Sequence, residues 1–385
     1  MANEAALSGI RVLELADGSA GGFCGKLFAG LGAEVIKSEP PEGDSLRHEG
    51  PFPGGRENLN ASGAYLNINT GKRSVTIDIK TPEGQALIAK LAAKSDVVLE
   101  SFEPGYLDSI NLGYKALSAN HPELIMVSVT PFGQTGPYAH YVANEMIVYA
   151  VSGYMSLAGD ADREPHKAHG DQAGIHAGYQ AALATMCALN ARDTITGGKG
   201  QHVDVAQIEG AAFLTGGPPH TYILRGEIAV RSGTRLLGGR ATNAYPSTLR
   251  PCKGGWIHAH SNTRYPEFMA DLMGEELNAP HLLKEPHGNA DEIDAIMDKW
   301  LAQYDKWEVV RLAQAKRLHF TEVMTPGEVL DDPAYEEREF WYRYELPGVG
   351  PIRQPGPVVR FAGTPWKNAP APALGADNAE ILAGV

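Results

Sequence analysis

The residue best placed to do chemistry is Asp171, which follows Gly170 and precedes a run rich in alanine and glycine, DQAGIHAGYQAALATMCALNA. This run predicts a helix over 171–191 that begins at Asp171. Aspartate is favoured at the N-cap of a helix, so a structural cap is one interpretation. The other is a nucleophile, because a carboxylate near the positive end of a helix dipole stays ionised and can attack an activated carbonyl carbon.

A second candidate site is a glycine-rich turn between a predicted strand and a predicted helix. Gly18, Gly21, Gly22 and Gly25 lie in it, and Glu39 ends the next predicted strand. This layout is similar to a dinucleotide-binding turn, but no G-x-G-x-x-G spacing is present, which disfavours a nicotinamide site. Backbone N–H groups at such a turn can hold an anion. The turn therefore predicts either contact with a nucleotide-like ligand or a tight structural turn.

The remaining polar clusters do not match known sites. Asp160 and Asp162 lack the other ligand positions of a calcium loop. His166, His169 and His176 share no ligand spacing that repeats on one helical face, and no G-x-S-x-G motif suggests a serine hydrolase. The three cysteines are far apart in the sequence, which predicts neither a metal site nor a disulfide framework.

The elements that would position these residues alternate between strand and helix over the first part of the chain. Thr81, Pro82 and Glu83 predict a helix start, with Thr81 as the N-cap. Short apolar runs predict strands at 10–15, 33–37, 74–79, 96–99, 125–129 and 201–206. This alternation indicates an α/β fold with a parallel sheet covered by helices on both faces. Gly174 and Gly178 share one helical face, which predicts close packing and a deeply buried helix.

The pattern changes after about residue 220. Residues 245–252 and 256–260 predict a β-hairpin, helical patterns follow over 265–317, and the tail from residue 346 is rich in proline and glycine. We expect a large domain over 1–220, a smaller α+β domain over 221–320, and a segment over 321–385 that is mostly extended and returns to the large domain.

Composition limits the partners. The net charge is -13, which disfavours binding to nucleic acid and to anionic membranes. Apolar residues make up 43% of the chain, enough for a sizeable core, and no apolar stretch approaches membrane-spanning length. The absence of a secretory signal and the odd number of cysteines favour a reducing cytoplasm.

Several long motifs resemble one known family. These are LSGIRVLELADGSAGGFCGKLFAGLGAEVIKSEPPEGDSLR at the start, GKRSVTIDIKTPEG, SFEPGYLDSINLG, SVTPFGQTGPYA, GDQAGIHAGYQAAL, TGGKGQHVDVAQIEGA, and FAGTPWKNAPAPALGADNAEIL near the end. Together they resemble the family III CoA transferases, also called the CaiB/BaiF family. The resemblance covers most of the first 212 residues and the last 25.

The resemblance implies a Rossmann-like large domain built from both chain ends, an inserted small domain, and a homodimer of two interlocked rings. It implies that Asp171 is the catalytic aspartate, with no tightly bound cofactor and with CoA as a substrate. The residues it implies around the ligand are, for CoA, Gly18, Ser19, Ala20, Ile77, Lys80, Phe102 and Phe132, and, for the substrate pocket and its covering loop, Glu145, His169, Gly238 and Gly239.

Two positions depart from the family pattern. Glu103 stands where many relatives carry a positive charge, and Pro40 stands where one well-known member has an arginine. We therefore expect the CoA phosphates to be held by Lys37, Lys72, Arg73 or Lys80, or by residues of the partner subunit.

The family chemistry implies transfer of CoA between carboxylic acids through an aspartyl anhydride and an aspartyl-CoA thioester on Asp171. A competing hypothesis on the same fold is an α-methylacyl-CoA racemase, which needs two proton-transfer groups. The position of its histidine corresponds to Asn144 here, with Glu145 next to it and His169 and His176 as further candidates. Two hypotheses from different classes are a nicotinamide-linked oxidoreductase and a non-catalytic CoA-binding protein.

Overall fold

The computed structural model describes residues 4–235, 245–260 and 267–385, and these form two compact units. The first unit consists of residues 1–152, 168–214 and 333–385, so it is built from both ends of the chain. The second unit consists of residues 153–167 and 215–332.

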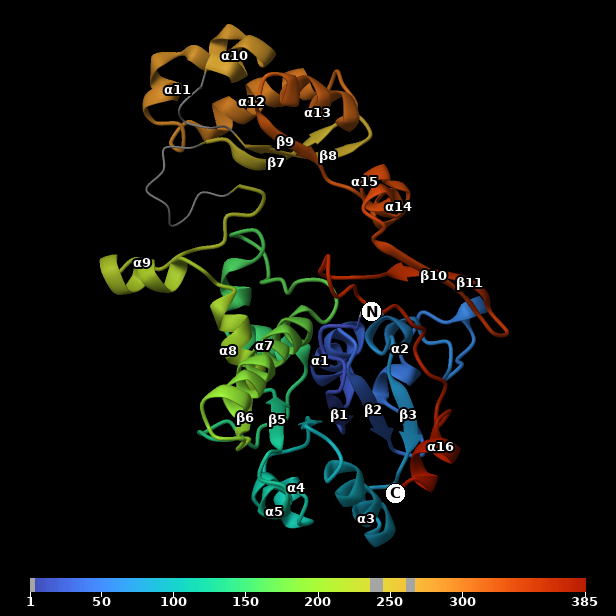
Figure 1. Ribbon diagram of the computed structural model, residues 1–385. Helices are drawn as coiled ribbons and strands as arrows, with labels where there is room; N and C mark the ends of the chain where they lie inside the picture. The colour runs from blue at the N-terminus through green and yellow to red at the C-terminus, as the bar shows by residue number, and fades with distance from the viewer. Residues whose placement is uncertain (1–3, 236–244, 261–266) are drawn as a thin grey trace. The chain divides into compact units, whose positions relative to one another are not determined.

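The first unit contains a six-stranded sheet in the order β3-β2-β1-β4-β5-β6, in which every neighbouring pair is parallel (Figure 1). The strands are β1 (Arg11–Glu14), β2 (Glu34–Glu39), β3 (Arg73–Thr76), β4 (Val97–Glu100), β5 (Ile125–Thr130) and β6 (His202–Ala206). This is the strand order of a Rossmann-like sheet, with its switch point between β1 and β4. The predicted α/β class and the six predicted strands are confirmed.

Helices cover both faces of this sheet. They are α1 (Gly18–Gly30), α2 (Gly63–Ile68), α3 (Pro82–Ala92), α4 (Tyr106–Ser109), α5 (Tyr114–Asn120), α6 (Glu145–Val151), α7 (Gln172–Thr194), α8 (Gln207–Phe213) and α16 (Asn378–Ala383). Helix α15 (Pro333–Glu337) belongs to the same unit. One core cluster joins α1 and α7 to Val127 and Val129, and another joins α3 and α16 to Val98 and Met126. Because successive strand side chains point to opposite faces, the two clusters lie on opposite sides of the sheet.

The closest helix contact is between α1 and α7. A Cβ atom added at Gly174 would lie 2.4 Å from Ser19 Oγ, and one added at Gly178 would lie 2.7 Å from the Ala20 carbonyl oxygen. The predicted packing role of the two glycines is confirmed. The prediction that the whole helix is deeply buried is wrong for the single chain, because Tyr179 and Leu183 on its other face are 44% and 68% exposed.

The second unit packs helices on one face of a three-stranded antiparallel sheet, in the order β7-β8-β9. Its elements are β7 (Ser247–Cys252), β8 (Gly255–His260), β9 (His319–Glu322), α9 (Pro218–Arg225), α10 (Glu267–Met273), α11 (Pro280–Lys284), α12 (Ala290–Leu301), α13 (Lys306–Ala315) and α14 (Pro326–Asp331). The predicted hairpin is confirmed, with Cys252 opposite Gly255. Strand β9 was not predicted.

The C-terminal segment returns to the first unit and closes the edge of its sheet. Asp377 Oδ2 accepts the Ser74 N–H at 2.8 Å, and Asn378 Oδ1 accepts the Thr76 N–H at 2.8 Å. These side chains satisfy the free backbone donors of the edge strand β3. The segment also forms an unpredicted hairpin of β10 (Trp341–Leu346) and β11 (Gly350–Pro355), as well as helix α16.

Candidate active site

Two cavities lie at the carboxyl ends of the six parallel strands, where open α/β sheets bind their ligands. The first, called the Asp171 cavity, has a volume of about 410 Å³ and is lined by Asp17, Gly18, Ser19, Ala20, Ser45, Leu46, Glu49, Ser101, Val129, Pro131, Ala143, Asn144, Glu145, Val148, Asp171 and Gln207. The second, called the Lys80 cavity, has a volume of about 370 Å³ and is lined by Leu15, Ala16, Asp17, Lys37, Ser38, Glu39, Pro40, Glu42, Gly43, Asp44, Ser45, His48, Ile77, Ile79, Lys80 and Phe102. Asp17 and Ser45 line both, so the two cavities adjoin.

Asp171 stands at the N-cap position of α7, as predicted, but its side chain does not cap the helix. Glu145 does so instead, because its carboxylate accepts the Ala173 N–H at 2.7 Å and the Gly174 N–H at 3.2 Å. The purely structural interpretation of Asp171 therefore loses its main support. The Asp171 carboxylate is half-buried and lines the cavity without a capping bond.

The charges around the Asp171 cavity are of two kinds. Asp17, Glu49, Glu145 and Asp171 are acidic, and none of the described residues that line it is a lysine, arginine or histidine. The 13-residue helix α1 and the 23-residue helix α7 both begin here, and helix N-termini attract anions. The first backbone N–H groups of α1, at Gly18 to Ala20, have no acceptor within the helix. Backbone dipoles therefore supply positive potential that the side chains lack.

Burial raises the pKa of two of these acids. For Asp17, burial is the larger cause and the Asp44 charge adds to it. For Glu49, burial is again the larger cause, followed by the Asp171 charge. Glu49 and Asp171 line the same cavity.

The Lys80 cavity brings together several of the residues predicted to bind CoA. Ile77, Phe102 and Lys80 all line it. Lys80 is exposed, and among the described residues no carboxylate pairs with its ammonium group. The backbone of the α1 turn lines one of two adjoining cavities, and Lys80 lines the other.

Two of the predicted cations are already fully engaged. Lys37 Nζ lies 2.9 Å from Glu14 Oε1, 2.6 Å from Asp44 Oδ2 and 2.8 Å from the Ala16 carbonyl oxygen. Burial would lower the pKa of Lys37, but the Asp44 and Glu14 charges outweigh it and raise that pKa. An ammonium group has three protons to donate, so Lys37 has none left for a phosphate, although it lines the Lys80 cavity.

Lys72 is engaged in the same way and lines neither cavity. Its Nζ lies 2.8 Å from a Glu14 carboxylate oxygen, 2.7 Å from the Gly22 carbonyl oxygen and 2.7 Å from Asn69 Oδ1. Arg73 also points elsewhere, since its guanidinium bonds Glu34, Asp377 and Glu380. Among the four lysine and arginine candidates, only Lys80 combines a place in the cavity with a free charge.

The other predicted substrate residues are placed as follows. Phe132 is buried, packs edge-on against Tyr138 and Tyr141, and lines neither of the two cavities. His169 is exposed, two residues before Asp171, and lines neither cavity. Gly238 and Gly239, the predicted covering loop, lie outside the described residues.

Sequence reasoning missed several residues of the two cavities. Asp17 and Ser45 join them, Glu49 faces Asp171, and His48 lines the Lys80 cavity. The Glu57 carboxylate accepts a hydrogen bond from the His48 ring, which raises the pKa of His48 and favours its charged form. The one feature of the sequence that could have identified any of these residues is the position of Asp17 directly before the predicted glycine turn.

The geometry also bears on proton-transfer chemistry. Asn144 Oδ1 accepts the Ile147 N–H at 3.1 Å and so caps α6. Glu145, the neighbouring candidate for a base, already accepts two backbone N–H groups. Within the described part of the chain, no cluster of three or more histidine, cysteine, aspartate or glutamate residues could hold a metal ion. Over the described ranges, none of the helices is long and apolar enough to cross a membrane.

Comparisons with known proteins point to one family. The family model described as CoA-transferase family III matches residues 7–378. The chain is 34% identical to a succinyl-CoA–D-citramalate CoA-transferase of Chloroflexus aurantiacus, over 98% of this chain and 93% of that protein. It is 32% identical to a succinate–glutarate CoA-transferase of Agrobacterium fabrum, over 98% of this chain and 95% of that protein. A crystal structure of a CaiB/BaiF family protein from Brucella suis superposes with a TM-score of 0.86 at 29% identity, over 99% of each chain.

Proposed function

Because the chain belongs to CoA-transferase family III, we propose that it moves coenzyme A from an acyl-CoA donor to a carboxylic acid acceptor through covalent intermediates on Asp171. The observation that carries the proposal is the half-buried Asp171 carboxylate, which lines the cavity at the α7 N-terminus while Glu145 takes over the capping role. A nucleophile must be oriented and still have its oxygens available, and this arrangement provides both.

The proposed steps balance as follows. An oxygen of Asp171 attacks the donor thioester, which forms a mixed anhydride and releases CoA thiolate. The thiolate attacks the aspartyl carbonyl, giving an aspartyl-CoA thioester and the free donor acid. The acceptor carboxylate attacks this thioester, and the returning thiolate takes the acceptor acyl group, which restores Asp171. Every intermediate is an activated acyl group, so no further energy source is required.

The developing negative charge on the thioester oxygen needs hydrogen-bond donors. The Ala173 and Gly174 N–H groups beside Asp171 are already bonded to Glu145. We therefore assign this role to the first N–H groups of α1, at Gly18 to Ala20, which line the same cavity. The CoA portion would extend from there past Asp17 and Ser45 into the Lys80 cavity.

The names of the relatives suggest a starting substrate class, with succinyl-CoA or another dicarboxylic CoA ester as donor and a dicarboxylic acid as acceptor. The side chains that line the Asp171 cavity provide no cation for a second carboxylate among the described residues. A dicarboxylic substrate would then need a cation from outside this cavity. Monocarboxylic acids belong in the same screen for that reason.

The test is a transfer assay with succinyl-CoA and other acyl-CoA donors against a panel of mono- and dicarboxylic acids, read by mass spectrometry of the CoA esters. We expect a new CoA ester of at least one acceptor with wild type and none with Asp171→Asn. Exchange of the α-proton for deuterium in deuterium oxide, without any new CoA ester, would instead favour the racemase hypothesis.

A further inference from the structure

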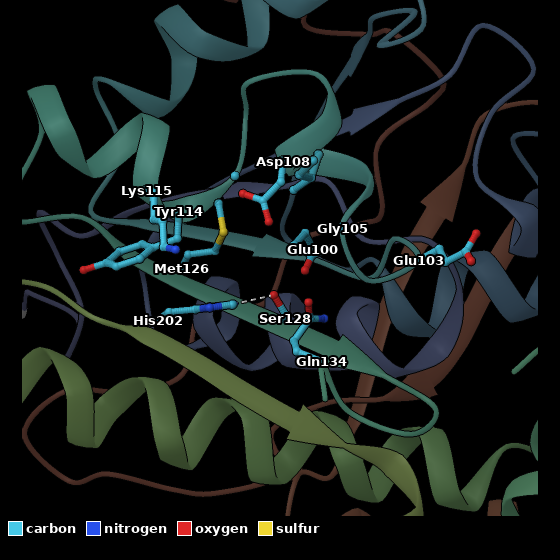
Figure 2. A pocket seen from close by; sticks show the side chains of 12 residues that line it. Glu100, Glu103, Gly105, Asp108, Tyr114, Lys115, Met126, Ser128, Gln134 and His202 are labelled. Carbon is cyan, nitrogen blue, oxygen red and sulfur yellow. Dashed lines mark hydrogen bonds between the residues drawn. The ribbon is translucent and has the colours of Figure 1, made fainter. Parts of the chain in front are cut away.

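A third cavity, of about 190 Å³, lies on the sheet face opposite α7, beneath α4 and α5 (Figure 2). Its lining includes Glu100, Asp108, Ser128, Gln134 and His202. The Glu100 and Asp108 side chains point toward its interior, whereas Glu103 points away (Figure 2). None of these five residues lines the Asp171 cavity or the Lys80 cavity.

Glu100, the last residue of β4, is the most constrained acid of this group. It is only 4% exposed, and its Oε2 accepts the Phe102 N–H at 2.7 Å. The Ser128 hydroxyl lowers the pKa of this carboxyl group, and Ser128 Oγ lies 2.8 Å from His202 Nε2. Residues of β4, β5 and β6 thus line the same cavity, and Glu100 holds the Phe102 backbone.

The Ser101–Phe102 segment, whose backbone Glu100 holds, connects the third cavity with the other two. Ser101 lines the Asp171 cavity, and its Oγ accepts the Asp17 N–H at 2.9 Å. Phe102 lines the Lys80 cavity. Asp17 in turn accepts the Ser45 N–H at 2.8 Å, so the residues that join the two cavities depend on this segment.

We propose that Glu100 is a positioning residue for acyl-CoA binding, which acts from behind the sheet by fixing the Ser101–Phe102 segment that lines both cavities. This inference rests on the proposed function. Glu100 touches neither cavity, so it acts through Phe102 and Ser101. Its charge matters, because a hydrogen bond to an ionised acceptor is roughly twice as strong as one to a neutral acceptor.

The same carboxylate makes acyl-CoA binding sensitive to pH. Burial raises the pKa of Glu100 against the effect of the Ser128 bond, and the Asp204 and Asp108 charges add to the rise. The other titratable groups that line this cavity are Glu103, which points away from it, Tyr114, Lys115 and His202 (Figure 2). As pH falls through this raised pKa, Glu100 becomes neutral and its bond to Phe102 weakens.

Because the pKa of Glu100 is raised, its charge has opposite effects on acyl-CoA binding and on the stability of the fold. A carboxyl group whose pKa is raised by folding contributes stability below its unfolded pKa and loses it as pH rises through the folded value. At neutral pH the ionised Glu100 therefore lowers stability. Glu100→Gln, which keeps an acceptor oxygen without the charge, should weaken CoA binding while leaving the melting temperature equal or higher.

The experiment measures the Kd for CoA by calorimetry, the KM for the acyl-CoA donor, kcat and the melting temperature. The variants are Glu100→Gln, Glu100→Ala and Ser128→Ala, with Glu123→Gln as a control that removes an exposed charge ahead of β5. We expect Kd and KM to rise about threefold for Gln and about tenfold for Ala. We expect kcat to stay within about twofold and the control to match wild type. The pH dependence of KM should be flatter for Glu100→Gln than for wild type.

Unchanged Kd and KM in Glu100→Gln and Ser128→Ala, in an enzyme that transfers CoA, would overturn the inference. So would a parallel fall of kcat and melting temperature in Glu100→Gln, because that pattern marks a structural role only. If Glu100→Ala does not fold, the Gln and Ser128→Ala variants decide. A wild-type enzyme that binds CoA without transferring it would count against the proposed function and leave the Kd comparison valid.

Discussion

At the scale of single residues, the local sequence determines which element a side chain lies on, whereas contacts with distant segments determine whether its charge is free. Lys37 lies at the end of one predicted strand and Lys72 just before another, but Glu14 and Asp44 occupy their ammonium groups inside the unit. A glutamate such as Glu14 within a buried strand was the only sign in the sequence of an internal ion pair. The place of Asp171 at the start of a helix could be predicted from the sequence, because a distinctive alanine- and glycine-rich run follows it. That Glu145 caps this helix in its place could not be predicted, because the capping bond joins distant segments.

The first prediction concerns Lys80. Lys80→Ala should raise the KM for the acyl-CoA donor about threefold at low salt, because an exposed ion pair with a phosphate is lost. The effect should shrink as ionic strength rises. Lys199→Ala, which removes an exposed lysine that lines neither cavity, is the control. Equal KM values for the Lys80 variant and wild type at low salt would exclude Lys80 from the CoA site.

The second prediction concerns Lys72, whose side chain is fully buried against Glu14. Lys72→Met should lower the free energy of unfolding by about 3 kcal/mol, because it leaves part of a buried carboxylate unpaired. Below the melting transition the KM for the acyl-CoA donor should be unchanged. A denaturant titration together with steady-state kinetics measures both. A raised KM in a variant of unaltered stability would return Lys72 to the CoA site.

At the scale of elements, segments with a clear apolar pattern or helix cap could be predicted, and segments without one could not. Helix α3 begins after Thr81 as expected, and Thr81 Oγ1 accepts the Gly84 N–H at 3.0 Å. Strands β9, β10 and β11 have only four to six residues each and pair with segments that local sequence does not identify. The grouping of residues 153–167 with the second unit depends on contacts between distant parts of the chain, which no local pattern encodes.

The third prediction tests the contact between α1 and α7. Gly178→Ala places a Cβ atom 2.7 Å from the Ala20 carbonyl oxygen and 2.9 Å from Phe23 Cβ. We expect a loss of about 1–3 kcal/mol of stability from overpacking. We also expect a lower kcat, because both the α1 turn and Asp171 depend on this contact. Gly327→Ala in α14 is the control, since its Cβ would meet nothing closer than 4.0 Å. A Gly178→Ala enzyme as stable as wild type would refute the close-packing account.

At the scale of the whole molecule, the exposed apolar surface of the first unit is the main unexplained feature. Phe213 on α8 is 81% exposed, Leu183 on α7 is 68% exposed, and Val142 before α6 is 93% exposed. Apolar side chains gathered on neighbouring helices are typical of surfaces that bind another protein. The interlocked homodimer implied by the family resemblance would supply such a partner.

The fourth prediction is that the protein is a homodimer that does not dissociate on dilution. Threaded rings cannot separate without unfolding, so subunits labelled differently should not exchange in native buffer. Light scattering and subunit exchange followed by native mass spectrometry measure these properties. A monomer at nanomolar concentration, or exchange within hours, would contradict the interlocked arrangement.

The central claim is that Asp171 carries the covalent intermediates, and the most direct measurement follows an oxygen atom. When the acceptor carboxylate attacks the aspartyl thioester and then leaves as its CoA ester, one acceptor oxygen must remain on Asp171. An acceptor acid labelled with oxygen-18 should therefore transfer label to the peptide that contains Asp171, as read by mass spectrometry after turnover. Formation of the acceptor CoA ester with no label on that peptide would contradict the account.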